Sequence, residues 1–166
     1  MYYNKESEFV MYLDNFLKPK ELISLQEHFL TLEYSPVKTP DGKHYGLRHN
    51  FSLEELGNIN KIIKKYFFPY RNLKPLGISA HLRNNEKEPM FHLDQVKGNV
   101  ANFLLFVKGD SLFNNGTGFF KDNTLSSHIG FVENRALFFN GAKIWHGDLQ
   151  HFGDSSMRYT LNIFYR

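Results

Sequence analysis

The stretch RYTLNIF, residues 158–164, alternates between polar and apolar side chains as far as Ile163. Because successive residues of a β-strand point to opposite faces, this stretch predicts a strand with Arg158, Thr160 and Asn162 on one face. The other face is apolar and is expected to pack in a hydrophobic core. The polar face fits two situations equally well, a solvated face at a sheet edge or the wall of a binding site.

Further strand-like segments, rich in β-branched and aromatic residues, fill the chain from Lys74 onward. They cover residues 76–82, 100–107, 118–120, 128–132, 136–139, 144–146 and 157–164. Many short strands separated by Gly, Asn and Asp indicate a β-sandwich or jelly roll. Asn140-Gly141 is the strongest hairpin signal in the chain. The 17 Phe and 9 Tyr residues also favour a β-rich core, since large rings pack well on pleated surfaces.

The first 73 residues show a mixed helical and extended pattern. We expect a strand over residues 8–13, a helix over 19–32, a turn at Asp41-Gly42 between two extended pieces, and a second helix that begins at Ser52 and ends before Pro69. Pro19 suits the first turn of a helix, where its missing N–H costs nothing. Ser52-x-x-Glu55 has the pattern of a capping box. We therefore expect one domain, residues 1–166, with an α/β support (residues 1–73) and a jelly-roll core (residues 74–166).

Composition excludes several classes of function. The chain has no cysteine, so disulfides and thiol nucleophiles are ruled out, and neither a Gly-x-Ser-x-Gly elbow nor a phosphate-binding glycine loop occurs. No run approaches the ~20 apolar residues of a membrane span, and the N-terminus lacks an apolar signal core, so we expect a cytoplasmic protein. The net charge of +3 is scattered rather than clustered, which disfavours nucleic acid as a partner.

Two short motifs in the β-rich half carry side chains that can bind a metal. In Phe91-His92-Leu93-Asp94, the imidazole and the carboxylate are two residues apart, so a strand would point both to the same face. Trp145-His146-Gly147 lies far downstream at the end of another expected strand. Two imidazoles and one carboxylate on one side of a metal form the facial triad of non-haem Fe(II) oxygenases. A lone His-x-Asp is a weak signal, because 8 histidines produce such pairs by chance.

The strand expected over residues 158–164 adds a group that recognises carboxylates. The planar guanidinium of Arg158 matches a carboxylate with two hydrogen bonds, and Thr160 adds a hydroxyl beside it. Taken together, His92-x-Asp94, Trp145-His146 and Arg158-x-Thr160 resemble the Fe(II)/2-oxoglutarate-dependent oxygenases, particularly the prolyl-4-hydroxylase-like branch. The resemblance covers about residues 77–165. Residues 115–120 resemble the glycine-rich segment of that branch, and residues 135–140 resemble the strand and turn before its second histidine.

The resemblance implies a double-stranded β-helix (a cupin-like jelly roll) and a role for each motif. His92, Asp94 and His146 would bind Fe(II). Arg158 and Thr160 would bind the distal carboxylate of 2-oxoglutarate, with O2 as the second co-substrate. Decarboxylation of 2-oxoglutarate to succinate would be coupled to oxidation of a small-molecule, peptide or protein substrate, most simply by hydroxylation. Asn102 follows the His-x-Asp motif on an expected strand, and we expect it either near the co-substrate or satisfied by backbone groups.

Two positions depart from the pattern of that branch. Leu82 and Phe106 stand where tyrosines that contact the co-substrate are common. His81, Arg83 or Asn84 could replace the first of them. His81 is a weak rival metal ligand, because the charge of Arg83 on the same strand face would repel a cation.

The remaining histidines and polar segments have simpler interpretations. His28, His44 and His49 are expected at the surface or in a lid, and His128 and His151 are candidates for contacts near the metal or the substrate. Residues 34–48 and 84–90 are polar and loop-like and are candidate lid segments.

Two alternative functions stay open. One is a cupin-like metalloenzyme, such as an isomerase, that does not use 2-oxoglutarate, although this leaves Arg158-x-Thr160 unexplained. The other is a non-catalytic β-sandwich binding module in which His-x-Asp is incidental.

Overall fold

The computed structural model describes residues 9–38, 42, 44–52, 54–55, 63, 65, 73–83, 91–111, 115–149 and 157–166. The elements among them are β1 (Val10–Leu13), α1 (Pro19–Thr31), β2 (Ser35–Lys38), β3 (His44–Asn50), β4 (Pro75–Arg83), β5 (Phe91–His92), β6 (Ala101–Lys108), β7 (Gly116–Lys121), β8 (Thr124–Gly130), β9 (Ala136–Phe139), β10 (Trp145–Gly147) and β11 (Arg158–Tyr165). The mostly β fold is as predicted. No helix within these ranges is long and apolar enough to cross a membrane.

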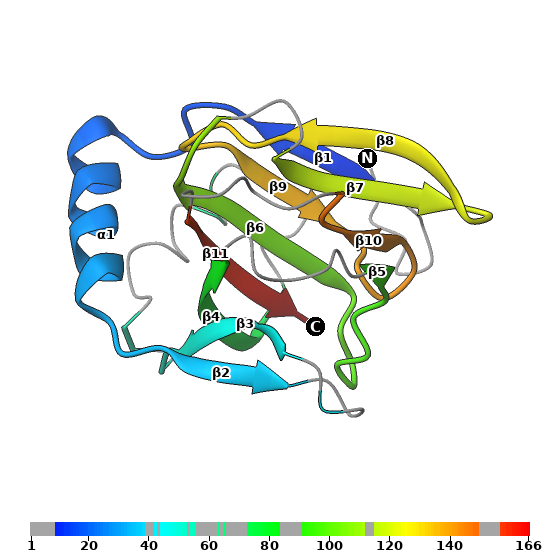
Figure 1. Ribbon diagram of the computed structural model, residues 1–166, viewed down its shortest axis with the longest axis horizontal. Helices are drawn as coiled ribbons and strands as arrows, with labels where there is room; N and C mark the ends of the chain where they lie inside the picture. Colours follow the sequence, from blue (N-terminus) through cyan, green and yellow to red (C-terminus); the bar gives the residue numbers. More distant parts are fainter. Residues whose placement is uncertain are drawn as a thin grey trace.

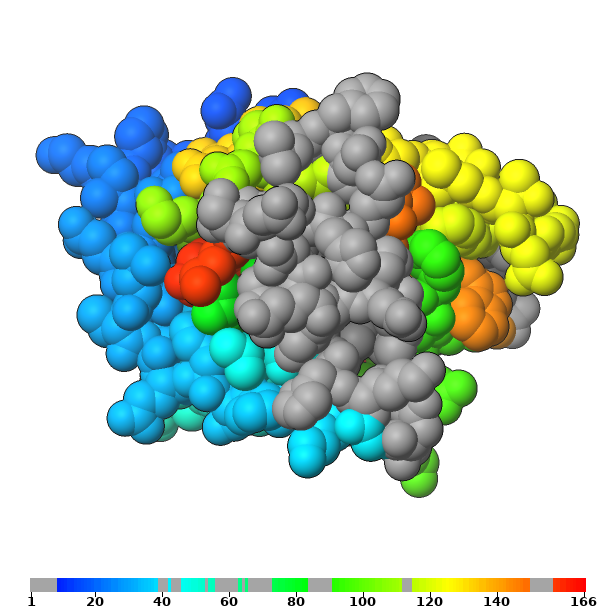
Figure 2. Space-filling model, in the orientation of Figure 1, coloured from blue at the N-terminus to red at the C-terminus, as the bar shows by residue number. Residues whose placement is uncertain are grey.

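The strands form two antiparallel sheets. The larger sheet has the order β1-β9-β6-β11-β4-β3-β2, and the smaller has the order β5-β10-β7-β8. Figure 1 shows α1 at the left edge of the molecule and the strands of the smaller sheet at the upper right. The hairpin of β7 and β8 projects at the right-hand side, where it is yellow in Figure 2. Strands from the N-terminal half therefore lie at both edges of the larger sheet.

The larger sheet has an apolar face and a face that is partly polar, as the alternation in residues 158–164 predicts. On β11, Leu161 and Ile163 are buried in a core that also contains Phe29 of α1. Arg158 and Thr160 point to the opposite face and are also buried. A second, smaller cluster of buried rings, Phe106, Phe119, Phe131 and Phe139, joins the two sheets. The polar wall is thus enclosed between the sheets rather than solvated at an edge.

The expected turn at Asp41-Gly42 is accompanied by a hairpin, because β2 and β3 pair antiparallel on either side of it. The two extended pieces expected there are these strands, so the described residues 35–38 and 44–48 of the candidate lid are not a loop. Most of the second expected helix lies outside the described residues. Its capping box is present, since Ser52 N donates to Glu55 Oε2 at 2.6 Å and Glu55 N donates to Ser52 Oγ at 3.4 Å.

The hairpin expected at Asn140-Gly141 is wrong. A turn is present, with Lys143 N donating to Asn140 O at 3.1 Å, but β9 before it and β10 after it belong to different sheets. The segment carries the chain from one sheet to the other. A two-residue hairpin occurs instead between β7 and β8, at Asp122-Asn123, where φ is 49° and 61°. Positive φ at both central residues suits the type of turn that follows the twist of paired strands.

Asn134 connects the N-terminal half to the sandwich. Its side chain accepts a hydrogen bond from Leu17 N and donates one to Leu17 O, both at 2.8 Å. Its own carbonyl accepts from Phe16 N at 3.0 Å. These bonds satisfy the buried backbone of the segment before α1, as a paired strand would. Asn134 has a φ of 66°, a conformation that asparagine tolerates better than most residues.

We expect Asn134→Gly to lower the free energy of unfolding by about 2–4 kcal/mol, because two buried backbone groups lose their partners while glycine accepts the positive φ. Asn134→Ala should cost about 1–2 kcal/mol more, since alanine is strained at that φ. Urea unfolding measures both values. Asn123→Gly, at an exposed residue with a similar φ, is the control and should change stability little. A stability of Asn134→Gly equal to that of the control would contradict the role of these bonds.

Candidate metal centre

Two histidines face each other across the pair of strands β5 and β10. His92 and His146 are directly opposite in the register, so their side chains leave the same face of the smaller sheet. Their ring centroids are 4.6 Å apart. The ring of His146 also packs against Phe139, with centroids 4.8 Å apart. The sheet therefore fixes both imidazoles on its inner side, toward the larger sheet.

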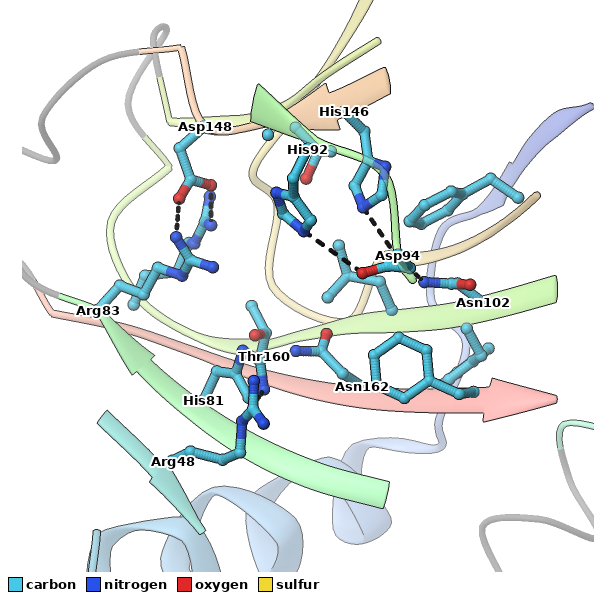
Figure 3. A pocket seen from close by; sticks show the side chains of 17 residues that line it. Arg48, His81, Arg83, His92, Asp94, Asn102, His146, Asp148, Thr160 and Asn162 are labelled. Atoms are coloured by element: carbon cyan, nitrogen blue, oxygen red, sulfur yellow. Dashed lines mark hydrogen bonds and ion pairs between the residues drawn. The ribbon is translucent and has the colours of Figure 1, made fainter. Parts of the chain in front are cut away.

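Asp94 follows β5 and completes the group. Its Oδ1 lies 3.4 Å from Nε2 of His92, and its Oδ2 lies 3.1 Å from Nε2 of His146 (Figure 3). The three candidate ligand atoms all lie within 4.8 Å of one another, and no other group of this kind occurs among the described residues. Nδ1 of His146 lies 2.9 Å from the carbonyl of Ile144, which holds the proton on Nδ1 and leaves the lone pair of Nε2 for a metal.

The environment of Asp94 favours its ionised form. Burial raises the pKa of this carboxyl, but its interactions with the facing imidazoles of His146 and His92 lower it by more. The net result is a pKa below the ordinary value for aspartate. The carboxylate is therefore charged at neutral pH, as a metal ligand must be.

Three further residues hold Asp94 in place. Nδ2 of Asn102 donates to Oδ2 of Asp94, and Oδ1 of Asn102 accepts from Nδ2 of Asn99 at 2.7 Å. The backbone N–H of Asp94 donates to the carbonyl of Gly141 at 2.8 Å. A Cβ at Gly141 would lie 2.6 Å from Nδ2 of Asn102 and would also collide with Asp94. The turn at Gly141 therefore needs glycine because it packs directly behind the Asp94 carboxylate.

The wall opposite the histidines is formed by β11 and β4. Arg158 is opposite Arg83 in the register, and Thr160 is opposite His81. These four residues line the same cavity as the His-Asp-His group, and so does Asn162 (Figure 3). The sequence-predicted residues Arg158, Thr160 and Asn102 are thus brought to one cavity with the candidate metal ligands.

Arg158 is paired with an acidic residue, Asp148, that the sequence analysis did not single out. One carboxylate oxygen of Asp148 accepts a hydrogen bond from Nη2 of Arg158, and the other lies 2.5 Å from Nη1 of Arg83. Nη1 of Arg158 donates to the carbonyl of Gly116 at 2.7 Å. Burial raises the pKa of Asp148, but the charges of Arg158 and Arg83 lower it by more, so it stays below the usual range. The only sequence signal was its place two residues after His146.

Leu82 and Phe106 stand at the two positions where the family pattern commonly has tyrosine. His81 and Arg83 line the cavity, whereas their neighbour Leu82 is not among the lining residues. Nε2 of His81 accepts a hydrogen bond from Nε of Arg48 at 3.1 Å, so its lone pair is not directed at a metal. Burial lowers the pKa of His81 well below its ordinary value, and the charges of Arg83 and Arg48 add to this effect. The ring of Phe106 lies under the guanidinium of Arg158, and Cζ of Arg158 is 5.8 Å from the ring centroid.

No other histidine of the described residues joins the group of candidate metal ligands. His28 packs near Phe51, with ring centroids 6.0 Å apart, and Nδ1 of His49 lies 2.9 Å from the carbonyl of Glu33. Nε2 of His128 is buried beside Gly116. The side chain of His44, and Asn84, His151 and the expected lid segment 84–90, lie outside the described residues.

No protein-family model matches the sequence, and no curated protein is significantly similar to it. Solved structures resemble its fold. A prolyl-4-hydroxylase from Pseudomonas putida superposes with a TM-score of 0.74 at 13% identity, covering 96% of this chain and 94% of that one. A prolyl hydroxylase from Trichoplax adhaerens, in complex with a peptide fragment of hypoxia inducible factor, gives 0.73 at 11% identity, covering 94% and 82%. An oxidoreductase of the 2OG-Fe(II) oxygenase family from Burkholderia pseudomallei gives 0.72 at 12% identity, covering 94% and 84%.

These likenesses extend over nearly the whole chain and confirm the fold expected from the motifs. The identities are low, so they speak for architecture rather than for a particular reaction. The chain has the double-stranded β-helix fold of the prolyl-4-hydroxylases and other 2OG-Fe(II) oxygenases.

Proposed function

We propose that the protein is an Fe(II)- and 2-oxoglutarate-dependent dioxygenase that hydroxylates a protein side chain or a small molecule. One observation carries this proposal. Two imidazoles and a carboxylate converge within 4.8 Å at a cavity whose opposite wall contributes Arg158 and Thr160. That combination supplies a facial set of metal ligands and a site for a distal carboxylate in one enclosed space.

The geometry of the three side chains fits a shared cation. Two ligands at about 2.1 Å from a metal, at right angles to each other, lie about 3 Å apart. The carboxylate of Asp94 lies 3.4 Å and 3.1 Å from the facing nitrogens of His92 and His146. Asp94 is held ionised, and Nδ1 of His146 faces the carbonyl of Ile144, so Nε2 is the nitrogen that would bind the metal. His92, Asp94 and His146 would hold Fe(II).

The polar wall would bind the co-substrate. When bound, Fe(II) and 2-oxoglutarate would supply the activation of O2 and the electrons from decarboxylation of 2-oxoglutarate to succinate. Arg158 would bind the distal carboxylate through its guanidinium, and Thr160 would donate its hydroxyl to the same group. Asn102 lines the same cavity and donates to Asp94, and we assign it to orienting that ligand. The neutral imidazole of His81 lies between these groups and Arg48 and would form the outer part of the wall.

The Trichoplax prolyl hydroxylase is in complex with a peptide. An extended peptide or a small molecule is the proposed substrate class here.

Anaerobic addition of Fe(II) and then 2-oxoglutarate tests the proposal. A weak visible charge-transfer band that needs both additions is the expected result. Succinate release should then rise with one member of a panel of peptides and small molecules. Metal binding without the band would favour a cupin-like metalloenzyme, and no metal binding would favour a binding module.

We expect Arg158→Ala to weaken 2-oxoglutarate binding by tens- to thousands-fold, since loss of one buried charge-assisted pair costs about 2–5 kcal/mol. Metal binding should stay within about twofold of wild type, because Arg158 does not contact the metal ligands. Calorimetric titration of the metal-free protein with Mn(II), and of the Mn(II)-loaded protein with 2-oxoglutarate, measures the two affinities. His92→Ala is the matched control and should lose the metal. Equal loss of metal and 2-oxoglutarate in Arg158→Ala would contradict the assigned role.

Gly141→Ala should weaken metal binding about 10- to 100-fold, a range typical for residues that orient metal ligands. The added methyl must displace Asn102 and Asp94. Gly130→Ala is the control, since a Cβ there would approach only the carbonyl of Asn115, at 4.0 Å. Metal titration with both variants decides the matter, and equal affinities would show that Asp94 does not bind the metal in this geometry.

A further inference from the structure

The guanidinium expected to receive the co-substrate already holds a carboxylate. Asp148 is 6% exposed, and its carboxylate bridges Arg158 and Arg83. Figure 3 shows Asp148 pointing at Arg83 on the same side of the cavity as His92. All of these residues line that cavity. An internal anion therefore sits where the proposed function requires an external one.

Arg158 cannot easily serve both anions. Its Nη1 is held by the carbonyl of Gly116 at 2.7 Å, and its Nη2 bonds Asp148, so the guanidinium is fixed on two sides. A second carboxylate on the same group would lie close to Asp148 in a buried place, where like charges repel strongly. Because Gly116 holds the guanidinium and Asp148 also contacts Arg83, the carboxylate of Asp148 is the group that would move.

Arg83 can keep the Asp148 carboxylate paired after it leaves Arg158. It is the cross-strand neighbour of Arg158, and its Nη1 already lies 2.5 Å from the second oxygen of Asp148. Asp148 can therefore leave Arg158 without becoming an unpaired buried charge, which would be costly. Of the other two arginines that line the cavity, Arg158 would then hold the co-substrate and Arg48 is hydrogen-bonded to His81. Without Arg83, the displaced carboxylate would therefore lose its cation.

We propose that Asp148 is a built-in competitor for the co-substrate: it occupies Arg158 until the distal carboxylate of a 2-oxo dicarboxylic acid displaces it onto Arg83. This inference rests on the proposed function, and it adds two residues, Asp148 and Arg83, that set the affinity for the distal carboxylate. A 2-oxo acid without a distal carboxylate cannot displace Asp148 and gains nothing from Arg158. Asp148 therefore lowers the affinity for dicarboxylic 2-oxo acids and leaves the affinity for monocarboxylic ones unchanged.

Calorimetric titration of the folded, Mn(II)-loaded protein tests the proposal with two probes. One probe is 2-oxoglutarate, and the other is 2-oxopentanoate, which has the same chain length but a methyl group in place of the distal carboxylate. Asp148→Asn should bind 2-oxoglutarate about tenfold or more tightly than wild type, because the competitor is removed. Arg83→Met should bind it about tenfold or more weakly, because displaced Asp148 then has no partner. Neither variant should change the affinity for 2-oxopentanoate or for Mn(II).

The titrations of the two variants distinguish the competitor from a general effect of charge. Opposite shifts for 2-oxoglutarate alone support the competitor. Weaker or unchanged binding in Asp148→Asn overturns it, and equal shifts for both probes overturn it by showing only a general effect of charge. If Asp148→Asn does not fold, the result for Arg83→Met decides alone. If wild type forms the Fe(II)–2-oxoglutarate band while the variants do not differ, this inference fails and the proposed function stands. If Mn(II) binds but no protein binds 2-oxoglutarate, both fail.

Discussion

The candidate site depends on the pairing of β5 with β10. This short pair sets His92 directly opposite His146, so both rings leave the inner face of the smaller sheet. Asp94 follows β5 by two residues and is tied by its N–H to the carbonyl of Gly141, in the turn that leads into β10. The two segments that supply the three side chains are therefore joined by backbone hydrogen bonds. If β5 left β10, all three would separate at once.

Enclosing charge between the sheets constrains the rest of the cavity. Arg158, Asp148 and Asp94 are each largely removed from water, and a buried charge is costly unless it is paired and hydrogen-bonded. Each has such partners: the Asp94 carboxylate meets two imidazoles and Asn102, and the Asp148 carboxylate meets two guanidinium groups. The cavity consequently keeps ionised groups in fixed positions before any ligand arrives, which is a form of preorganisation.

The N-terminal half does more than cover the sandwich. Its strands β1, β2 and β3 extend the larger sheet at both edges, and Arg48 on β3 contributes to the cavity through its hydrogen bond to His81. On the other side, Asn134 fastens the segment before α1 to the sandwich. The support and the polar wall are therefore continuous parts of one sheet.

By itself, the sequence determined what depends on neighbours along the chain. The alternation in residues 158–164 assigned Arg158 and Thr160 to one face, and His-x-Asp put its two ligands on one side, because strand geometry has a period of two. Turn chemistry located a turn at Asn140-Gly141. Only the tertiary structure decided what that turn joins, since the same residues suit a hairpin and a passage between sheets. It alone paired Asp148 with Arg83 and Arg158, because such contacts depend on strand register and on the burial that makes each charge require a partner.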